Sequence, residues 1–241
     1  MSGYIDLHCH FVPGIDDGAR TVEEGVALLQ ALHQAGFEEA IATPHMRPGM
    51  FDNTAADIAA AYDEMVPFVT AATGVPKTAL SSEHYFTDAV YQRILTGSGL
   101  PYPGGRAVLL EFYEIDFLPV IGQRLYDLRR RRLTPVIAHP ERYRCFWKSR
   151  TRLEELVQTG TVALLDTAAL VGKYGNEPKK CARKMLDEGL YHAACSDAHR
   201  PADVADVLAG MKYIRKKYGD DEMDRLFREG PEEILAGKAG S

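Results

Sequence analysis

Short apolar runs that alternate with amphipathic stretches constrain the fold of this chain most strongly. Runs rich in Val, Ile and Leu are the seven candidate strands, residues 4–7, 39–42, 78–81, 107–112, 134–138, 162–165 and 191–195. Helix-like segments separate them, such as residues 21–35 with apolar side chains at helical spacing, and residues 54–72, which follow the possible capping residues Asn53 and Thr54. Each such crossover implies a parallel neighbouring strand.

The length of 241 residues suits one domain of the size of an α/β barrel. No long linker, internal repeat or low-complexity tract divides the chain, so we predict a single domain over residues 1–241. Seven strand–helix units favour a distorted TIM-like (β/α)7 barrel. Periodicity alone does not separate this barrel from an open, doubly wound sheet.

Charge and cysteine usage exclude several classes of protein. A formal net charge of -6 and a pI near 5.8 argue against a broad basic face for nucleic acid. Neither a signal peptide nor an apolar run of membrane-spanning length is evident. The scattered Cys9, Cys145, Cys181 and Cys195 lack a C-x-x-C pair, which predicts free thiols, a reducing compartment and a cytoplasmic location.

The first candidate strand ends in the segment Asp6-Leu7-His8-Cys9-His10. Because side chains alternate along a strand, His8 and His10 are expected on one face, at the edge where barrel active sites form. The two histidines could together hold a metal ion. Taken alone, the H-x-H spacing fits a merely polar strand end equally well.

Other candidate strands end in similar residues at the same edge. These residues are His45, Glu83, Glu111, His139, Asp197 and His199, and Asp16 and Asp17 lie in the loop after the first strand. Imidazole and carboxylate without thiolate suit Mn²⁺, Fe²⁺ or Zn²⁺ in a catalytic site rather than a structural zinc. Glu111 could instead form a buried ion pair, and the two aspartates could shape a turn before Gly18.

In their order along the chain, these segments resemble the PHP (polymerase and histidinol phosphatase) superfamily, and within it the bacterial tyrosine phosphatases of the CpsB/YwqE type. The resemblance covers nearly the whole chain. Its motifs are residues 6–10 with 16–18, 43–45 with 49–51, Glu83, 110–112, 136–143 and 196–199.

The resemblance implies a PHP fold and a site of three divalent ions, most often manganese, with iron or zinc as alternatives. The implied metal ligands are His8, His10, Asp17, His45, Glu83, Glu111, His139, Asp197 and His199. It also implies a phosphate-binding Arg142 and a second basic contact from Arg200. Protonation of the leaving oxygen would fall to Asp197 or His199, whereas Asp16 is expected to serve the loop.

A metal-activated water is the expected nucleophile, because metal binding lowers the pKa of water to about 7. A cysteine-dependent phosphatase would separate its cysteine and arginine by five residues, and Cys195 and Arg200 miss that spacing by one. Cys9 is expected to face away from its two histidine neighbours and to fill the core. No phosphate-binding loop of the G-x-x-x-x-G-K-[ST] type is present.

Three further features have weaker interpretations. Tyr113, Phe51 and Phe86 follow presumed ligands and could either accept a phenyl ring or pack in loops. Residues 165–170 lie where relatives often carry a polar asparagine, and this departure leaves substrate contacts there open. Residues 129–132 form an arginine run that fits a solvated helix end better than the docking of an acidic tail.

The sequence therefore predicts a metal-dependent protein tyrosine phosphatase, with a bacterial tyrosine kinase of the capsule or exopolysaccharide system as its implied partner. One alternative is a small-molecule phosphomonoesterase such as a histidinol-phosphate phosphatase. Others are a non-catalytic metal-binding scaffold and a metal-dependent C–N hydrolase. The hydrolase is the weakest alternative, because such sites rarely need a phosphate-binding arginine.

Overall fold

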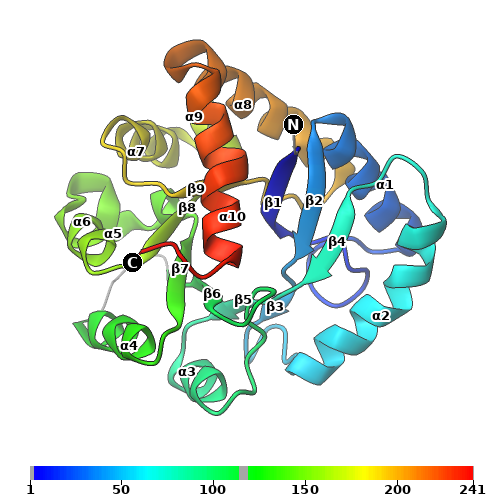
Figure 1. The fold of residues 1–241 in the computed structure, drawn as a ribbon, viewed down its shortest axis with the longest axis horizontal. Helices are drawn as coiled ribbons and strands as arrows, with labels where there is room; N and C mark the ends of the chain where they lie inside the picture. Colours follow the sequence, from blue (N-terminus) through cyan, green and yellow to red (C-terminus); the bar gives the residue numbers. More distant parts are fainter. Residues whose placement is uncertain (1–2, 114–118, 241) are drawn as a thin grey trace.

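Parallel strands surrounded by helices form the fold of the chain (Figure 1). A computed structural model describes residues 3–113 and 119–240; the remaining residues of the predicted 1–241 domain lie outside this description. The strands are β1 (Tyr4–Cys9), β2 (Phe37–Ala42), β3 (His45–Met46), β4 (Lys77–Leu80), β5 (Glu83–Tyr85), β6 (Ala107–Glu111), β7 (Thr134–Ala138), β8 (Val162–Asp166) and β9 (Ala193–Cys195). The α-helices are α1 (Val22–Gln34), α2 (Ala55–Ala71), α3 (Asp88–Leu95), α4 (Pro119–Arg130), α5 (Arg144–Lys148), α6 (Thr151–Gln158), α7 (Asn176–Asp187), α8 (Val204–Tyr218), α9 (Asp220–Asp224) and α10 (Gly230–Leu235). Short helical turns are η1 (Pro140–Arg142), η2 (Thr167–Val171), η3 (Pro201–Asp203) and η4 (Arg225–Glu229).

The strands close into a distorted barrel. One sheet has the order β1-β2-β4 and the other β3-β5-β6-β7-β8-β9, and every pairing between these strands is parallel. β3 follows β2 after Thr43 and Pro44, and β5 follows β4 in the same way, so each pair acts as one bent strand. A bridge between Cys9 and Ala198 joins the end of β1 to the segment after β9. The predicted seven-stranded barrel is confirmed, with strand ends shifted by at most two residues.

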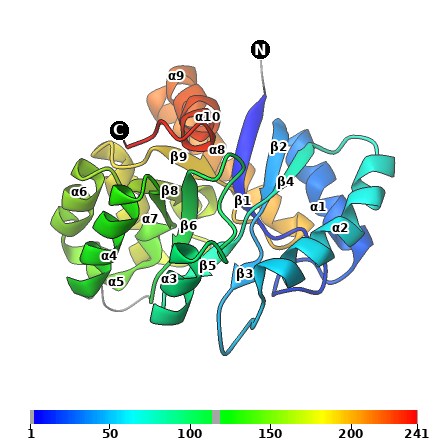
Figure 2. The ribbon, with the colours of Figure 1, turned by 60° about the horizontal axis from the view of Figure 1, so that its bottom comes forward.

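Two apolar layers hold the barrel together. The larger cluster fills the space between the strands and the surrounding helices, and a smaller cluster that includes Leu7, Leu109, Val136 and Leu164 fills the barrel interior. Ile234 of α10 packs on the interior cluster. Figure 2 shows α10 at the end of the barrel where β1 begins, opposite β3. The C-terminal strand ends therefore remain free to present side chains.

An irregularity in β1 aims the two histidines of that strand. The pairing of β1 with β2 shifts register between Asp6 and Cys9, as in a β-bulge. Within the shifted stretch Leu7 faces the barrel interior, whereas Cys9 at its end belongs to the outer cluster. The backbone carbonyl of Leu7 accepts a 2.8 Å hydrogen bond from the Tyr102 hydroxyl. The predicted packing role of Cys9 is confirmed, and its neighbours His8 and His10 point inward.

Helix starts and thiols agree with the sequence expectations. Thr54 caps α2 through a capping box with Asp57, which assigns the cap to Thr54 rather than Asn53. All four cysteines are free thiols, as predicted. Among the described residues, no helix is long and apolar enough to cross a lipid bilayer.

Candidate metal centre

All nine residues predicted as metal ligands converge at the C-terminal ends of the strands. They form four overlapping groups, and within each group one ligand atom per residue lies within 4.8 Å of the others. The groups are His10, Asp17, His45 and His199; His8, His10 and Asp197; His8, Glu83 and His139; and His45, Glu83 and Glu111. Because the groups share members, the nine side chains form one continuous cluster.

The Glu83 carboxylate lies at the centre of the cluster. Its oxygens are 2.9 Å from His139 Nε2, 3.0 Å from His45 Nδ1 and 3.2 Å from His8 Nε2. Glu83 is the first residue of β5, and its side chain is only 1% exposed. The register of the β3–β5 pairing places it beside His45. A fully buried carboxylate requires compensating positive charge, because desolvation disfavours its ionised form. The surrounding imidazoles provide this compensation and lower the pKa of Glu83 despite its burial.

Two of the candidate ligands have left-handed backbone conformations. His139 has a φ of 34° and Asp197 a φ of 44°, and Arg132 is the third non-glycine residue with positive φ in the described part of the chain. Such conformations cost of order 1–3 kcal/mol and cluster at functional sites. Here they turn both side chains into the mouth of the barrel: Asp197 Oδ1 lies 3.3 Å from His8 Nε2 and 3.4 Å from His10 Nε2.

Asp16 orients His10, a role beyond the loop function expected from the sequence. Its Oδ2 lies 2.8 Å from His10 Nδ1, and its Oδ1 accepts a 2.8 Å hydrogen bond from the Gly18 backbone. Burial alone would lower the pKa of His10, but the charges of Asp16 and Asp197 raise it well above its ordinary value. A carboxylate on one ring nitrogen directs the other nitrogen towards the cluster, as in carboxylate–histidine–metal arrangements.

Replacing Asp16 by asparagine is therefore expected to weaken manganese binding and to lower kcat/KM by about 10- to 100-fold. Titration of chelator-stripped protein with manganese and steady-state kinetics would measure both effects. Asp52→Asn is a matched control, because Asp52 also braces a nearby loop, through the Gly49 backbone at 2.7 Å, and has no hydrogen bond to a histidine. Equal effects of the two substitutions would contradict the orienting role of Asp16.

Glu111 and Glu83 bring two carboxylates together beside His45. Burial, followed by the charge of Glu83, raises the pKa of Glu111 to about 7. Glu111 Oε2 lies 3.8 Å from His45 Nδ1 and 3.7 Å from Arg47 Nη1. A divalent cation between the two carboxylates would remove their mutual repulsion.

The donor set fits a divalent metal ion. No hydrogen bond satisfies the buried atoms Glu111 Oε2 and His45 Nδ1, since the 3.0 Å contact of His45 Nδ1 with Glu83 lacks hydrogen-bond geometry, and both residues belong to the same candidate group. Buried polar atoms in native structures almost always have a partner, so such atoms at one site indicate a ligand. Nitrogen and oxygen donors of this kind suit manganese, iron or zinc.

Arg142 lies at the edge of the cluster, fixed by two aspartates and a tyrosine. It forms ion pairs with Asp166 and Asp197, and its Nη2 lies 2.7 Å from the Tyr174 hydroxyl. Its guanidinium carbon is 3.8 Å from the centroid of the Tyr174 ring. The sequence left substrate contacts of residues 165–170 open, and it singled out neither Asp166 nor Tyr174. The aspartate at position 166 holds this arginine in place.

The structure places Arg200 differently from Arg142. The Arg200 guanidinium donates to the backbone carbonyl of Gly18, and its Nε lies 3.3 Å from Glu24 Oε1 on α1. These contacts brace the loop that carries Asp17, which itself lies 3.4 Å from His45 and 3.5 Å from His199. A direct phosphate contact by Arg200 stays a prediction.

Aromatic side chains surround the cluster in different ways. Phe51 stacks on His45, with ring centroids 5.3 Å apart and planes 6° from parallel. Tyr113 is 60% exposed, whereas Phe86 is buried. His84 points away from the cluster, as expected, because its Nδ1 lies 2.9 Å from the Leu109 carbonyl.

Comparison with known proteins gives one consistent result. Residues 4–236 match the sequence model of the family described as "Capsular polysaccharide synthesis, CpsB/CapC". The tyrosine-protein phosphatase YwqE of Bacillus subtilis is 28% identical over 233 residues, which cover 96% of this chain and 91% of YwqE.

The similarity extends to solved structures. A structure from the crystallographic work on YwqE of Bacillus subtilis and CpsB of Streptococcus pneumoniae, described there as unique metal-dependent tyrosine phosphatases, superposes with a TM-score of 0.88 at 26% identity. The match covers 98% of this chain and 95% of the other. The phosphotriesterase homology protein of Escherichia coli matches with a TM-score of 0.61 at 14% identity, covering 97% and 99% of the two chains, which supports the barrel fold alone.

Proposed function

The chain belongs to the CpsB/CapC family of capsular polysaccharide synthesis, and on this premise we propose that it is a metal-dependent protein tyrosine phosphatase. The observation that carries the proposal is the convergence of nine imidazole and carboxylate side chains beside the partly buried Arg142. Divalent ions held by these side chains, together with the arginine, would neutralise the charged oxygens of a phosphate monoester as the leaving oxygen departs. YwqE, a relative along nearly the whole chain, is itself a tyrosine-protein phosphatase.

We propose that the nine side chains hold three divalent ions, with manganese as the native metal. Bound ions would supply a water of lowered pKa as the nucleophile and neutralise the phosphoryl oxygens. Glu83 reaches three histidines from different strands, so it holds the separate parts of the cluster together. His10 is kept in one orientation by Asp16.

Arg142 would bind the phosphate at the edge of the cluster. A guanidinium offers two parallel N–H donors that match two oxygens of a phosphate. Asp166 and the Tyr174 ring restrict the orientation of this guanidinium, so little conformational entropy remains to be lost on binding. Asp197 or His199 would protonate the leaving oxygen, since both lie in the same cluster.

The proposed physiological substrate is a phosphotyrosine-bearing protein, specifically a bacterial tyrosine kinase of the capsule or exopolysaccharide system. The capsule context is that of the family. A cytoplasmic location is part of the same proposal, because it suits the four free thiols.

Parallel kinetics test the proposed function. Manganese-loaded protein would be assayed on a phosphotyrosine peptide, the matched phosphoserine peptide and histidinol phosphate. The proposal predicts the highest kcat/KM for the phosphotyrosine peptide. A higher value for histidinol phosphate would assign the protein to small-molecule phosphatases, and no turnover of any phosphoester would favour the scaffold.

Metal loading is also expected to stabilise the fold. Manganese at about 100 times its Kd would add ~2.7 kcal/mol to the free energy of unfolding, which corresponds to a rise in Tm of about 5–10 °C for a chain of this size. Differential scanning calorimetry of chelator-stripped protein, with and without manganese, would measure the shift. An unchanged Tm would contradict a metal site within the fold.

A further inference from the structure

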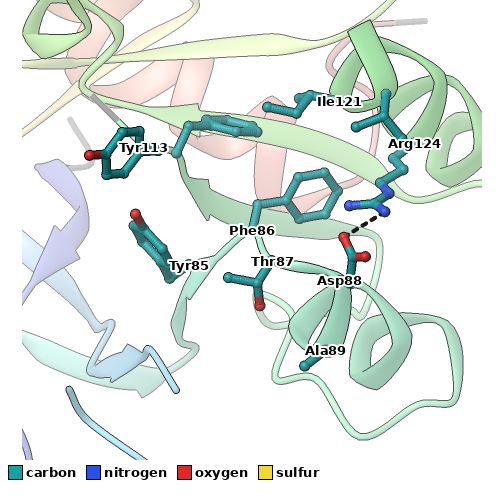
Figure 3. Close-up of a pocket in the computed structure, with 10 residues that line it drawn as sticks. Tyr85, Phe86, Thr87, Asp88, Ala89, Tyr113, Ile121 and Arg124 are labelled. Carbon is teal, nitrogen blue, oxygen red and sulfur yellow. Dashed lines mark ion pairs between the residues drawn. The ribbon is translucent and has the colours of Figure 1, made fainter. Parts of the chain in front are cut away.

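An apolar groove lies beside the candidate metal centre, between α3 and α4. Its cavity volume is about 650 Å³, within the range of ligand-binding pockets. Figure 3 shows Tyr85 and Tyr113 at one end, the ring of Phe86 in the middle, and Arg124 with Asp88 at the other end. The other lining residues are Thr87, Ala89, Phe112, Val120 and Ile121.

Neighbouring residues place the groove next to the metal centre. Tyr85 pairs with Glu111 in the β5–β6 ladder, and Tyr113 follows Glu111 by two residues. The guanidinium carbon of Arg47 lies 4.2 Å from the Tyr85 ring centroid, and its Nη1 lies 3.7 Å from Glu111. A molecule held at the cluster would therefore meet the tyrosine end of the groove first.

The lining favours an uncharged, apolar occupant. Its ion pair, between Arg124 Nη2 and Asp88 Oδ1 at 2.7 Å, is internally neutral. Tyr113 is 60% exposed and Val120 45% exposed, which places two of the large exposed apolar side chains of the described residues in this one groove. A concave apolar surface with a few polar groups at its ends is typical of ligand-binding sites.

We propose that this groove binds an apolar side chain of the substrate peptide, located a few residues from the phosphotyrosine. The inference rests on the proposed function. The phosphotyrosine ring is bonded directly to the ester oxygen and stays at the mouth, near Tyr85 and Tyr113. Beyond that end the groove passes Phe86, which packs in the cluster outside the barrel, and reaches α4. An extended peptide advances about 3.3–3.6 Å per residue. A side chain a few residues from the phosphotyrosine can therefore reach past the mouth into the groove.

A peptide series, one small substrate and two variants test the proposal with manganese-loaded protein. In the series, a serine-rich phosphotyrosine peptide receives a single leucine at each position in turn on either side of the phosphotyrosine. The small substrate is para-nitrophenyl phosphate, which has no flanking residues. The variants are Val120→Asp in the groove and Leu208→Asp on α8, whose side chain is 47% exposed and lies outside the groove lining.

We expect leucine at one position, or at two neighbouring ones, to raise kcat/KM about tenfold in the unaltered protein and in Leu208→Asp, because burial of a leucine contributes at least this factor. Val120→Asp should lose this gain and keep its activity on the serine-rich peptide and on para-nitrophenyl phosphate. Aspartate in the first turn of α4 is compatible with the helix dipole, so the variant should fold.

Several results would overturn the proposal. Peptide hydrolysis without any leucine effect, or a gain that survives Val120→Asp, would remove the inference and leave the proposed function intact. A loss of para-nitrophenyl phosphate turnover in Val120→Asp would assign the groove to the aryl ring itself. Dimerisation abolished by Val120→Asp would assign it to a second copy of the chain. Hydrolysis of para-nitrophenyl phosphate but of no phosphotyrosine peptide would refute both the inference and the proposed function.

Discussion

Replacement of Glu83 by glutamine is expected to lower kcat/KM on a phosphotyrosine peptide by about 10³-fold or more and to reduce bound manganese. The Glu83 carboxylate lies within 3.2 Å of three histidine nitrogens and belongs to two of the candidate metal groups. Glutamine keeps the shape but removes the charge, and metal stabilisation of a transition state contributes several kcal/mol. A 10³-fold loss corresponds to ~4 kcal/mol.

Glu141→Gln is the matched control for this substitution. Glu141 is also a fully buried glutamate, but it contacts the Asp166 backbone and the Tyr191 hydroxyl and lies outside the metal groups. Burial, followed by the charge of Asp166, raises the pKa of Glu141 to about 8, so a neutral side chain suits its position. The control should keep its metal and lose at most a few-fold in rate. Full activity of Glu83→Gln with a full metal content would refute the assignment of the cluster.

Replacement of Arg142 by lysine is expected to lower kcat/KM by about 10²-fold while the metal content stays unchanged. Lysine keeps the positive charge but not the planar pair of donors, and it cannot stack on Tyr174 in the same way. Removal of one group that stabilises a transition state typically costs 10²–10³-fold. Steady-state kinetics combined with metal analysis would separate this loss from a loss of metal.

Arg144→Lys controls for the change from arginine to lysine. Arg144 lies two residues after Arg142 and is exposed, and its guanidinium carbon lies 5.8 Å from the Trp147 ring centroid. The Arg144→Lys variant should retain full activity. Comparable losses in the two variants would show that Arg142 does not contact the phosphate.

Much of the fold and the positions of the candidate ligands could be predicted from the sequence. Strands β6 to β9 are short and largely apolar until a polar residue ends or follows each of them, and parallel strands in a barrel place these ends at one edge. The two-residue period correctly placed His8 and His10 on one face. The same logic brings Glu111 and Asp197, far apart in the chain, into one cluster.

Other features depend on contacts that no local pattern contains. Asp16 reaches His10 because the loop folds back onto β1, and Asp166 and Tyr174 meet Arg142 only after β8 and the turn that follows it are in place. The short strands β3 and β5 have two and three residues, too few for a periodic signal. The groove between α3 and α4 likewise joins separate segments.

The metal dependence of the proposed reaction can be measured as hydrolysis of a phosphotyrosine peptide by chelator-stripped protein, with manganese, zinc, magnesium or no metal added back. Bound metal would be measured on the same samples. We expect no phosphate release without metal, restored release with manganese, and a rate that rises in proportion to the metal bound. Equal phosphate release with and without metal would contradict the proposed metal-dependent phosphatase activity. So would the absence of phosphate release with any metal in samples that contain bound metal.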